Sequence, residues 1–337
     1  MRIIRTLAAT AALATTMAVA GAAHAGKDLD AIKARGQLIC GVGPSSAGFY
    51  LLGSDGKWSG IDVDVCRAIA AAILGDSEKV RYVPASAQQR FQQVQSGEVD
   101  LLSRTTTWTL TRDTALGLDF GHVTVYDGQG FMVPKKLGVK SAKDLKGATV
   151  CVQPGTTTEL NLADYFRANK MDFKPVVIER LEEVEQAYFS GRCDVYTTDA
   201  SGLAATRATR AQNPDDHLIL PEIISKEPLG PAVRHGDNQW ADIVRWTFNA
   251  QLEAEEKGIT SKNIDEMLKS ADPSIKRLLG VTPGMGKALG VDEDWVVKVI
   301  RQVGNYGEMF ERNVGKNTPL KLERGLNALW TQGGPQY

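Results

Sequence analysis

Two stretches of the chain repeat one order of apolar and polar positions. In each, an amphipathic segment ends at Ser-Gly, two residues precede an aspartate, an apolar run follows, and threonines come next. The first stretch covers residues 91–107 and the second covers residues 184–198. Helical spacing followed by a short apolar run predicts a helix leading into a buried strand. We therefore expect two similar α/β lobes, the alternative being a chance repetition of a common helix–glycine–strand unit.

The lobe boundaries follow from the segments between these stretches. The chain leaves the first lobe near Tyr126–Phe131, and Glu227–Pro231 is expected to cross back, because Pro and Gly there limit regular structure and suit a hinge. We assign residues 26–128 and 229–337 to lobe 1 and residues 129–228 to lobe 2.

The chain after the return crossing is expected to be helical. Residues 238–257 form a helix that finishes lobe 1 and stops at Gly258. Its apolar positions are expected in the core: Ile243, Val244, Trp246, Phe248 and Leu252. In the tail from Asp272 to Tyr337, residues 292–310 and 322–330 predict two further helices. We expect this helical extension to pack on lobe 1, a partner-binding role being the alternative.

The first 25 residues have the pattern of a signal peptide. Arg2 and Arg5 precede an apolar, Ala-rich run, and Ala23-His24-Ala25 supplies the small residues of a cleavage site. The run is too short and too rich in Ala and Thr for a good membrane span. We expect a soluble, exported protein, most simply in a bacterial periplasm.

Composition narrows the choice of partners. Without residues 1–25, the chain has 37 basic and 40 acidic residues, a formal charge of −3. This near-neutral balance without long charge runs argues against nucleic acid or an anionic membrane as a partner. About 310 residues suffice for two domains with their own cores.

The four cysteines favour disulfides, because an even number in an exported protein is typical of them and the spacing fits no zinc pattern. Each disulfide would close a loop of a few tens of residues and would stabilise the fold by on the order of 3–4 kcal/mol in the chain-entropy model. We pair Cys40 with Cys66 and Cys151 with Cys193, one pair per lobe. Sequence alone does not fix this connectivity, and four free buried thiols are the alternative. We expect no metal and no cofactor.

The stretch from Val99 to Phe120 carries the candidate binding chemistry. An apolar strand runs into a hydroxyl-rich segment that ends on Arg112. Ligands of open α/β sheets bind beyond the carboxyl ends of strands, and the planar fork of arginine can hold both oxygens of a carboxylate. Taken alone, the stretch also fits a threonine-rich turn with a surface arginine.

Several short motifs together resemble a known family. In chain order they are Gly60–Val65, Ser96–Asp100, Thr109–Arg112, Asp119-Phe120, Asp144–Gly147, Gly155–Thr157, and Asp194 with Asp199. With the signal peptide, they resemble the bacterial extracellular solute-binding proteins of the polar amino-acid group, the exported receptors of ABC importers, over residues 29–268. The long tail resembles the subtype with broad specificity for L-amino acids.

This resemblance implies a two-lobe periplasmic binding protein fold of type II. Each lobe has a mostly parallel open sheet flanked by helices, and two crossing segments form a hinge. The resemblance also implies a monomer that binds L-amino acids and delivers them to the permease subunits of an ABC importer.

The resemblance assigns the ligand contacts to both lobes. Arg112 would hold the α-carboxylate bidentately, and Asp199 would take the α-ammonium. Thr105 and Thr107 would flank the ligand. Thr156 and Thr157 would bind the same carboxylate at a helix N-terminus, which suits an anion. A zwitterion needs one fixed cation and one fixed anion, so a ligand held by both lobes would close them. Asp199 also fits a helix N-cap, and the two roles are compatible.

The expected pocket departs from relatives that stack an aromatic ring on a single cationic ligand. The loop after the first strand has Ser45, Ser46 and Ala47 there, which favours a roomy, permissive pocket. Trp108 adjoins the site, but its alternation with Thr107 equally fits a core position.

Two other functions are possible on this fold. An exported dehydratase would need an acid or base beside the carboxylate site, for which Glu159 and His122 are the nearest candidates. Glu159 fits better as a first-turn helix carboxylate and His122 as a loop residue, and no nucleophile or phosphate-loop motif occurs. The sensor domain of a receptor would need an attached membrane helix. We therefore expect a binding protein rather than an enzyme.

Overall fold

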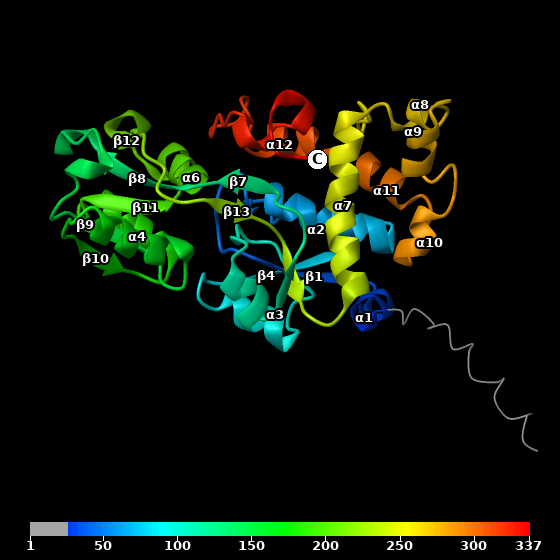
Figure 1. The fold of residues 1–337 in the computed structure, drawn as a ribbon, viewed down its shortest axis with the longest axis horizontal. Coiled ribbons are helices and arrows are strands. Elements are labelled where there is room, and N and C mark those ends of the chain that lie inside the picture. The colour runs from blue at the N-terminus through cyan, green and yellow to red at the C-terminus, as the bar shows by residue number, and fades with distance from the viewer. Residues whose placement is uncertain (1–25) are drawn as a thin grey trace, which may run out of the picture.

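The computed structural model describes residues 26–337 (Figure 1). The expected signal peptide, residues 1–25, lies outside the described residues. Two five-stranded sheets lie one after the other along the long axis of the molecule, and helices cover both faces of each sheet. The later helices gather around one end, where α7 stands upright in Figure 1.

The first sheet has the order β4-β1-β5-β14-β6. Its strands are β1 (Leu38–Val42), β4 (Val80–Pro84), β5 (Leu101–Leu102), β6 (Leu118–Phe120) and β14 (Ala232–Arg234). β1 pairs in parallel with β4 and β5, whereas β14 runs antiparallel to β5 and β6. Every residue of β1 is buried, because Leu38, Cys40 and Val42 pack in the core with α2 while Ile39 packs with Val94 of α3.

The second sheet repeats this arrangement with the order β10-β9-β11-β8-β12. Its strands are β8 (Gln129–Pro134), β9 (Thr149–Val152), β10 (Lys174–Val177), β11 (Val195–Asp199) and β12 (His217–Ile219). β9 is parallel to β10 and β11, and β8 is antiparallel to β11 and β12. Val150 and Val152 face α4, whereas Cys151 between them packs with α5 and α6. Both sheets are therefore mixed: in each, four strands run in one direction, and one strand, β14 or β8, runs in the opposite direction.

The repeated aspartate has the same task in both lobes. Asp100 follows α3 (Arg90–Ser96) and accepts a hydrogen bond from the backbone N–H of Ile39 at 2.7 Å. Asp194 follows α5 (Leu181–Phe189) and accepts one from the N–H of Thr149 at 2.8 Å. Asp100 thus ties the start of β5 to β1, and Asp194 ties the start of β11 to β9.

Two crossing segments connect the sheets. β7 (Val125–Asp127) leads into the second sheet, and β13 (Glu227–Leu229) leads back. They pair antiparallel, with Asp127 opposite Glu227. The lobe boundaries given above stay a prediction, and these paired strands are where we expect the hinge. A small hairpin, β2 (Leu51–Leu52) with β3 (Trp58–Ser59), completes the strands.

The tail packs on the first sheet's helices. α2 (Ile61–Leu74) is buried on nearly every side, because the sheet covers one face while α7 (Asn238–Glu256), α11 (Trp295–Gln302) and α12 (Tyr306–Asn313) cover the rest. The remaining helices are α1 (Lys27–Arg35), α4 (Thr157–Ala168), α6 (Ala200–Arg210), α8 (Ile264–Met267), α9 (Pro273–Leu278) and α10 (Met285–Leu289). The helix expected over residues 292–310 is split, because Gly304 takes a φ of +91° and Asn305 caps α12.

Two further expectations were wrong. Trp246 is 48% exposed, although the other four apolar positions expected in the core of α7 are buried. Residues 322–330 form no α-helix but have a short 3-10 turn at Gly325–Asn327, where Gly325 has a φ of +47°. Another such turn follows at Trp330–Gln332. The Asn327 side chain instead bonds the backbone N–H and C=O of Tyr126.

The disulfides join Cys40 to Cys66 and Cys151 to Cys193, the pairs given by the sequence analysis. The first ties β1 to α2, and the second ties β9 to the segment before β11. They close loops of 26 and 42 residues.

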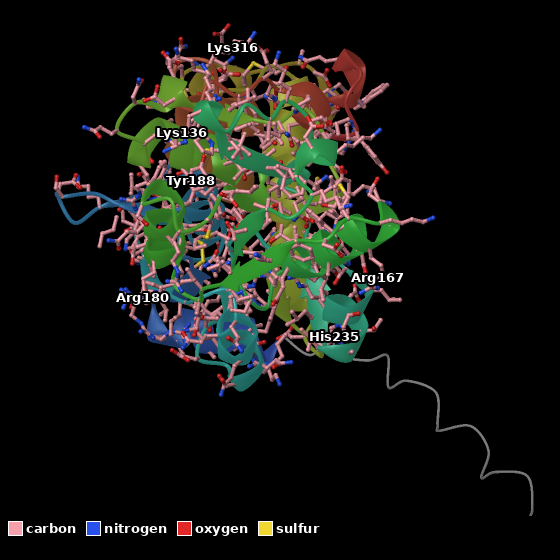
Figure 2. The ribbon with its side chains drawn as sticks, turned by 90° about the vertical axis from the view of Figure 1, so that its left-hand side faces the viewer. Lys136, Arg167, Arg180, Tyr188, His235 and Lys316 are labelled. Carbon is pink, nitrogen blue, oxygen red and sulfur yellow. A yellow bond between two sulfur atoms is a disulfide. The ribbon has the colours of Figure 1, made fainter. Side chains whose placement is uncertain are left out.

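The outer surface carries scattered charge. Figure 2 shows Lys136, Arg167, Arg180, His235 and Lys316 at separate places around the outline. Among the described helices, none is long and apolar enough to cross a membrane. Residues 26–337 also contain no cluster of three or more His, Cys, Asp or Glu side chains placed to hold a metal ion.

Candidate functional site

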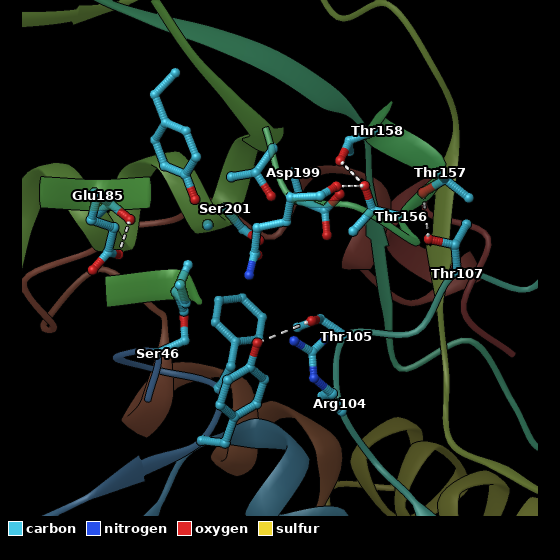
Figure 3. A pocket seen from close by; sticks show the side chains of 18 of the residues that line it. Ser46, Arg104, Thr105, Thr107, Thr156, Thr157, Thr158, Glu185, Asp199 and Ser201 are labelled. Carbon is cyan, nitrogen blue, oxygen red and sulfur yellow. Dashed lines mark hydrogen bonds between the residues drawn. The ribbon is translucent and has the colours of Figure 1, made fainter. Parts of the chain in front are cut away.

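A cavity lies between the two sheets, at the carboxyl ends of their parallel strands (Figure 3). It has a volume of about 630 Å³, its opening included. Residues from both lobes line it: Ser46, Phe49, Tyr50, Arg90, Arg104, Thr105, Thr107, Gln153, Thr156, Thr157, Thr158, Leu181, Glu185, Tyr196, Thr198, Asp199, Ser201, Gly202 and Thr206. Thr107 and Thr157 face each other near one end in Figure 3, and Ser46 and Glu185 lie near the other.

The lobe 1 wall is formed by the segment that follows β5. Thr105 has a φ of +35°, a left-handed conformation that non-glycine residues rarely adopt. The buried Asp62 of α2 holds this turn, because it accepts hydrogen bonds from the N–H of Thr105 at 3.1 Å and the hydroxyl of Ser103 at 3.0 Å. Burial raises the pKa of Asp62 to about 6. Asp62 thus positions the threonines without lining the cavity itself.

Arg112 lies behind this wall. It is buried in a π-helical turn, Thr111–Ala115, and its Nη1 donates to the backbone carbonyl of Thr107 at 2.8 Å. Burial lowers the pKa of Arg112 to about 10, opposed by the nearby carboxylates of Glu227 and Asp199. The guanidinium therefore stays charged near neutral pH. Of the six predicted ligand residues, all in the described part of the chain, it alone does not line the cavity.

The lobe 2 wall includes the first turn of α4. Thr156 is the N-cap, and its hydroxyl accepts from the N–H of Glu159 at 3.1 Å and donates to the carbonyl of Gln153 at 2.8 Å. Thr157 begins the helix, so the positive end of the helix dipole lies at the cavity wall. The hydroxyl of Thr156 serves the cap, while that of Thr157 turns toward lobe 1.

Asp199 ends β11 and occupies the N-cap position of α6, but its side chain makes no capping hydrogen bond. The carboxylate lines the cavity instead. Burial raises the pKa of Asp199 well above its ordinary value, and the neighbouring carboxylates of Asp127 and Glu227 raise it further. A cation in the cavity would stabilise its ionised form.

Glu227 connects the two walls and was not predicted as a site residue from the sequence. This carboxylate on β13 is 1% exposed and accepts hydrogen bonds from the hydroxyls of Thr107 at 2.5 Å and Thr157 at 2.8 Å. It also accepts from the Asn161 amide at 2.9 Å and the Ser225 hydroxyl at 2.7 Å. The lobes touch elsewhere as well, since Ser86 donates to Glu179 at 2.8 Å. Side chains of the two lobes therefore contact each other beside the cavity.

We expect Glu227→Gln to weaken ligand binding about tenfold or more. The glutamine amide NH2 would replace one carboxylate oxygen and would face the hydroxyl or amide donors that this oxygen accepts from, at a fully buried position. The affinity should fall because the closed arrangement of the two lobes is destabilised. The Kd from calorimetry and the radius of gyration from small-angle scattering are therefore measured together. Glu222→Gln is the matched control, because Glu222 is hydrogen-bonded to Ser141 and Ala142 at the far end of lobe 2. Unchanged affinity and unchanged ligand-induced compaction would rule out this role.

Four further residues of the cavity wall were not predicted from the sequence: Arg90, Arg104, Tyr50 and Glu185. Arg104 directly precedes the threonines and could have been noticed there. Tyr50 follows β1, Arg90 begins α3 and Glu185 lies on α5, and nothing in their local sequence marks them. Only the fold brings them to one cavity.

The residues considered for catalysis lie elsewhere. Glu159 accepts from the N–H of Gly155 at 3.0 Å, as a first-turn carboxylate. The Nε2 atom of His122 lies 3.0 Å from the side-chain oxygen of Gln336, and burial lowers the pKa of His122.

Trp108 is 42% exposed and stacks on Phe120, so it belongs neither to the core nor to the cavity wall.

Known proteins resemble this chain over nearly its whole length. Residues 38–266 match the family described as bacterial extracellular solute-binding proteins, family 3. A general L-amino acid-binding periplasmic protein of Rhizobium johnstonii is 58% identical, over 96% of this chain and 95% of that protein. A glutamate/glutamine/aspartate/asparagine-binding protein of Rhodobacter capsulatus is also 58% identical, over 95% of this chain and 94% of its own length.

A solved structure is similar in fold as well as in sequence. It is described as an ABC transporter/periplasmic binding protein from Brucella ovis with glutathione bound. Its chain is 59% identical and superimposes with a TM-score of 0.90, covering 92% of this chain and 97% of that one.

Proposed function

Because the chain belongs to family 3 of the bacterial extracellular solute-binding proteins, we propose that it is the periplasmic receptor of an ABC importer for L-amino acids, with broad specificity. It would bind the amino acid as a monomer between its closing lobes and deliver it to the permease subunits. The names of its relatives support both the ligand class and the periplasmic location.

One observation carries this proposal: the cavity lies between two lobes and has fixed charges of both signs. Arginines lie on the lobe 1 side and Asp199 on the lobe 2 side. A zwitterionic amino acid that engages both is bound only when the lobes are closed, so ligand binding would shift the population toward the closed state. Such closure is what a permease could recognise.

The proposal favours binding over catalysis. A dehydratase would need a proton donor or acceptor beside the bound acid. Asp199 and Glu185 are the carboxylates on the cavity wall of the described chain, and we give the first to the ligand's ammonium and find the second paired with Arg210. Glu159 and His122 have the structural contacts given above.

We propose γ-glutamyl peptides, whose first residue keeps both a free α-carboxylate and a free α-ammonium, as a second ligand class. A further cavity adjoins the first and shares Ser46, Glu185 and Thr206 with it. The space beyond a bound amino acid therefore continues between the lobes. The glutathione in the Brucella ovis structure supports this possibility, since its glutamyl residue carries both a free α-carboxylate and an α-ammonium.

Calorimetry on the mature protein tests the proposal. The protein is unfolded and refolded to remove carried-over ligand, then titrated separately with the common L-amino acids and with glutathione. We expect one-to-one binding of many chemically unlike L-amino acids, because the charges contact groups that all of them share. Binding of a single class would place specificity in the side-chain contacts. No heat with any of them on correctly refolded protein would overturn the proposal and favour the enzyme alternative.

A further inference from the structure

The end of the chain contacts the first crossing strand. The turn at Gly325–Asn327 packs on β7, and Figure 1 shows the red end of the ribbon beside this strand. Side chains of three tail residues bond the backbone of residues 123–126: Tyr306, Asn327 and Gln336. They are 0%, 8% and 0% exposed. The tail therefore holds the backbone that leads from lobe 1 into the expected hinge.

Asn327 takes the place of a neighbouring strand on β7. Its side-chain oxygen accepts from the N–H of Tyr126 at 2.7 Å, and its Nδ2 donates to the carbonyl of Tyr126 at 3.1 Å. An antiparallel neighbour exchanges the same two bonds with one residue of a strand. On β13, the residue opposite Tyr126 is Pro228, which has no N–H to donate. The Asn327 amide thus satisfies backbone groups that β13 leaves unpaired.

Tyr306 and Gln336 satisfy two earlier carbonyls of the same backbone. The Tyr306 hydroxyl donates to the carbonyl of Thr124 at 2.7 Å, and the Gln336 Nε2 donates to that of Val123 at 2.9 Å. The Gln336 side-chain oxygen also lies 3.0 Å from Nε2 of His122. A buried carbonyl that loses its donor costs free energy, so these bonds favour one backbone conformation.

The tail is itself anchored to helices of lobe 1. Arg312 donates to the buried carboxylate of Asp64 on α2, from Nε at 2.9 Å and from Nη2 at 2.7 Å. Arg324 pairs with Glu255 of α7 at 3.0 Å, and its guanidinium lies 4.8 Å from the centre of the Tyr306 ring. The side chains that hold β7 are therefore fixed relative to lobe 1.

β13 connects the other edge of β7 to the cavity wall. It pairs with β7 on one side and with the threonine segment on the other. The N–H of Trp108 donates to the carbonyl of Pro228 at 2.8 Å, and the N–H of Gly230 donates to that of Thr106 at 3.0 Å. β13 begins at Glu227, whose carboxylate bonds both walls. The strand that the tail holds is thus bonded to the strand that contacts both lobes at the cavity.

We propose that the C-terminal segment, residues 306–337, is a brace on the hinge that fixes residues 123–126 to lobe 1. Bending of the first crossing strand is then confined to the residues after Tyr126, where it enters lobe 2. This inference rests on the proposed function and adds a determinant of lobe closure outside the ligand cavity. A braced hinge gives the open state fewer backbone conformations, so ligand-driven closure loses less conformational entropy. The brace therefore raises the affinity for every ligand by the same factor.

The test is Asn327→Ala, which removes both bonds to Tyr126 without changing the cavity wall. Calorimetry on refolded protein gives the Kd for L-alanine, L-glutamine and L-glutamate, and small-angle scattering gives the radius of gyration with and without ligand. We expect each Kd to rise about fivefold, the effect of freeing the backbone of one residue. The radius of gyration should rise without ligand and equal that of the wild type with saturating ligand. Gln336→Ala should change both quantities in the same direction.

Asn263→Ala is the matched control. Asn263 also accepts from a backbone N–H, that of Thr260 at 2.7 Å, and donates to a carbonyl, that of Gly258 at 2.9 Å, but it lies before α8 and does not bond β7. Its Kd values and radius of gyration should equal those of the wild type. An equal change in Asn263→Ala and Asn327→Ala would overturn the brace, because any weakening of lobe 1 would then suffice.

Wild-type Kd values and scattering in both tail variants would also overturn the brace. So would a lower Kd, because the tail would then hold the lobes apart, or a change that differs between the amino acids, because the tail would then act on the ligand pocket. If Asn327→Ala does not fold, Gln336→Ala decides alone. Failure of all three amino acids to bind the wild type would instead overturn the proposed function.

Discussion

Replacing Arg112 by alanine should abolish high-affinity binding of every L-amino acid while the protein stays folded. Truncating one partner of a buried, hydrogen-bonded charge pair costs about 2–5 kcal/mol, which is roughly a 30-fold to several-thousand-fold rise in Kd. The loss should be uniform across ligands, because the α-carboxylate is common to all of them. The Kd values come from calorimetry, and circular dichroism with thermal melting monitors the fold.

The position of Arg112 makes this prediction demanding. Its guanidinium contacts the carbonyl of Thr107 rather than lining the cavity, so it would act on the ligand at the edge of the wall and also hold the threonine segment in place. Arg112→Lys separates the two effects, because lysine keeps the charge but lacks the planar fork that binds both oxygens of a carboxylate. We expect it to remain weak. Arg81→Ala changes an exposed arginine on β4 and is the control. Wild-type affinity in Arg112→Ala would remove Arg112 from the site.

Much of the fold could be predicted because its signals are local. The helix–glycine–aspartate–strand pattern occurs twice, and the structure shows why: Asp100 and Asp194 make the same hydrogen bond to the first strand of their sheets. Short apolar runs predicted the strands that follow these helices, β5 and β11, but not the outer parallel strands β4 and β10. The position of β14 between β5 and β6 could not be predicted, because this pairing joins residues more than one hundred positions apart. Nothing in the sequence around residue 232 specifies that distant partner.

The helix errors have physical causes of the same kind. Trp246 fits the apolar pattern of α7, but pattern alone does not say how far around a helix its neighbours extend, and it lies partly in solvent. The apolar spacing over residues 292–310 continues across Gly304, so the pattern predicts one helix. In the structure Gly304 has a positive φ and Asn305 caps α12, which packs against α7 and α2.

The candidate site also contains residues with a local sequence signal and residues that only the tertiary fold brings to the cavity. The structure brings Thr105, Thr107, Thr156, Thr157 and Asp199 to the cavity wall, and all of them lie at or just after strand ends, as expected for open α/β sheets. Arg90, Glu185 and Glu227 could not be assigned, because they belong to helices or to the crossing segment and reach the cavity only through the tertiary fold. Charged residues with ordinary local sequence become significant only when their burial is known.

Asp199→Asn should weaken binding of neutral L-amino acids by roughly 30-fold or more, because the α-ammonium loses the fixed anion that we assign to it at the cavity wall. The pH dependence gives a sharper signature. Since the pKa of Asp199 is raised, the protonated carboxyl must release its proton before it can pair with the ammonium. The ligand's ammonium stays charged between pH 5 and 7. As the pH falls through the raised pKa of Asp199, affinity should therefore drop, by up to about tenfold per pH unit, and binding should release protons.

Titration of L-alanine at several pH values, in buffers of different ionisation enthalpy, measures both the slope and the protons released. Asparagine cannot ionise, so the variant should lose the pH slope together with the affinity. Asp144→Asn changes an exposed aspartate of lobe 2 and should keep the slope and the affinity of the wild type. A variant at Asp199 that binds weakly but retains the full slope would assign the titration to Asp127, a neighbouring buried carboxylate whose pKa is also raised by burial. Wild-type affinity in Asp199→Asn would show that the ammonium is held elsewhere, and the two-lobe division of the zwitterion would then be wrong.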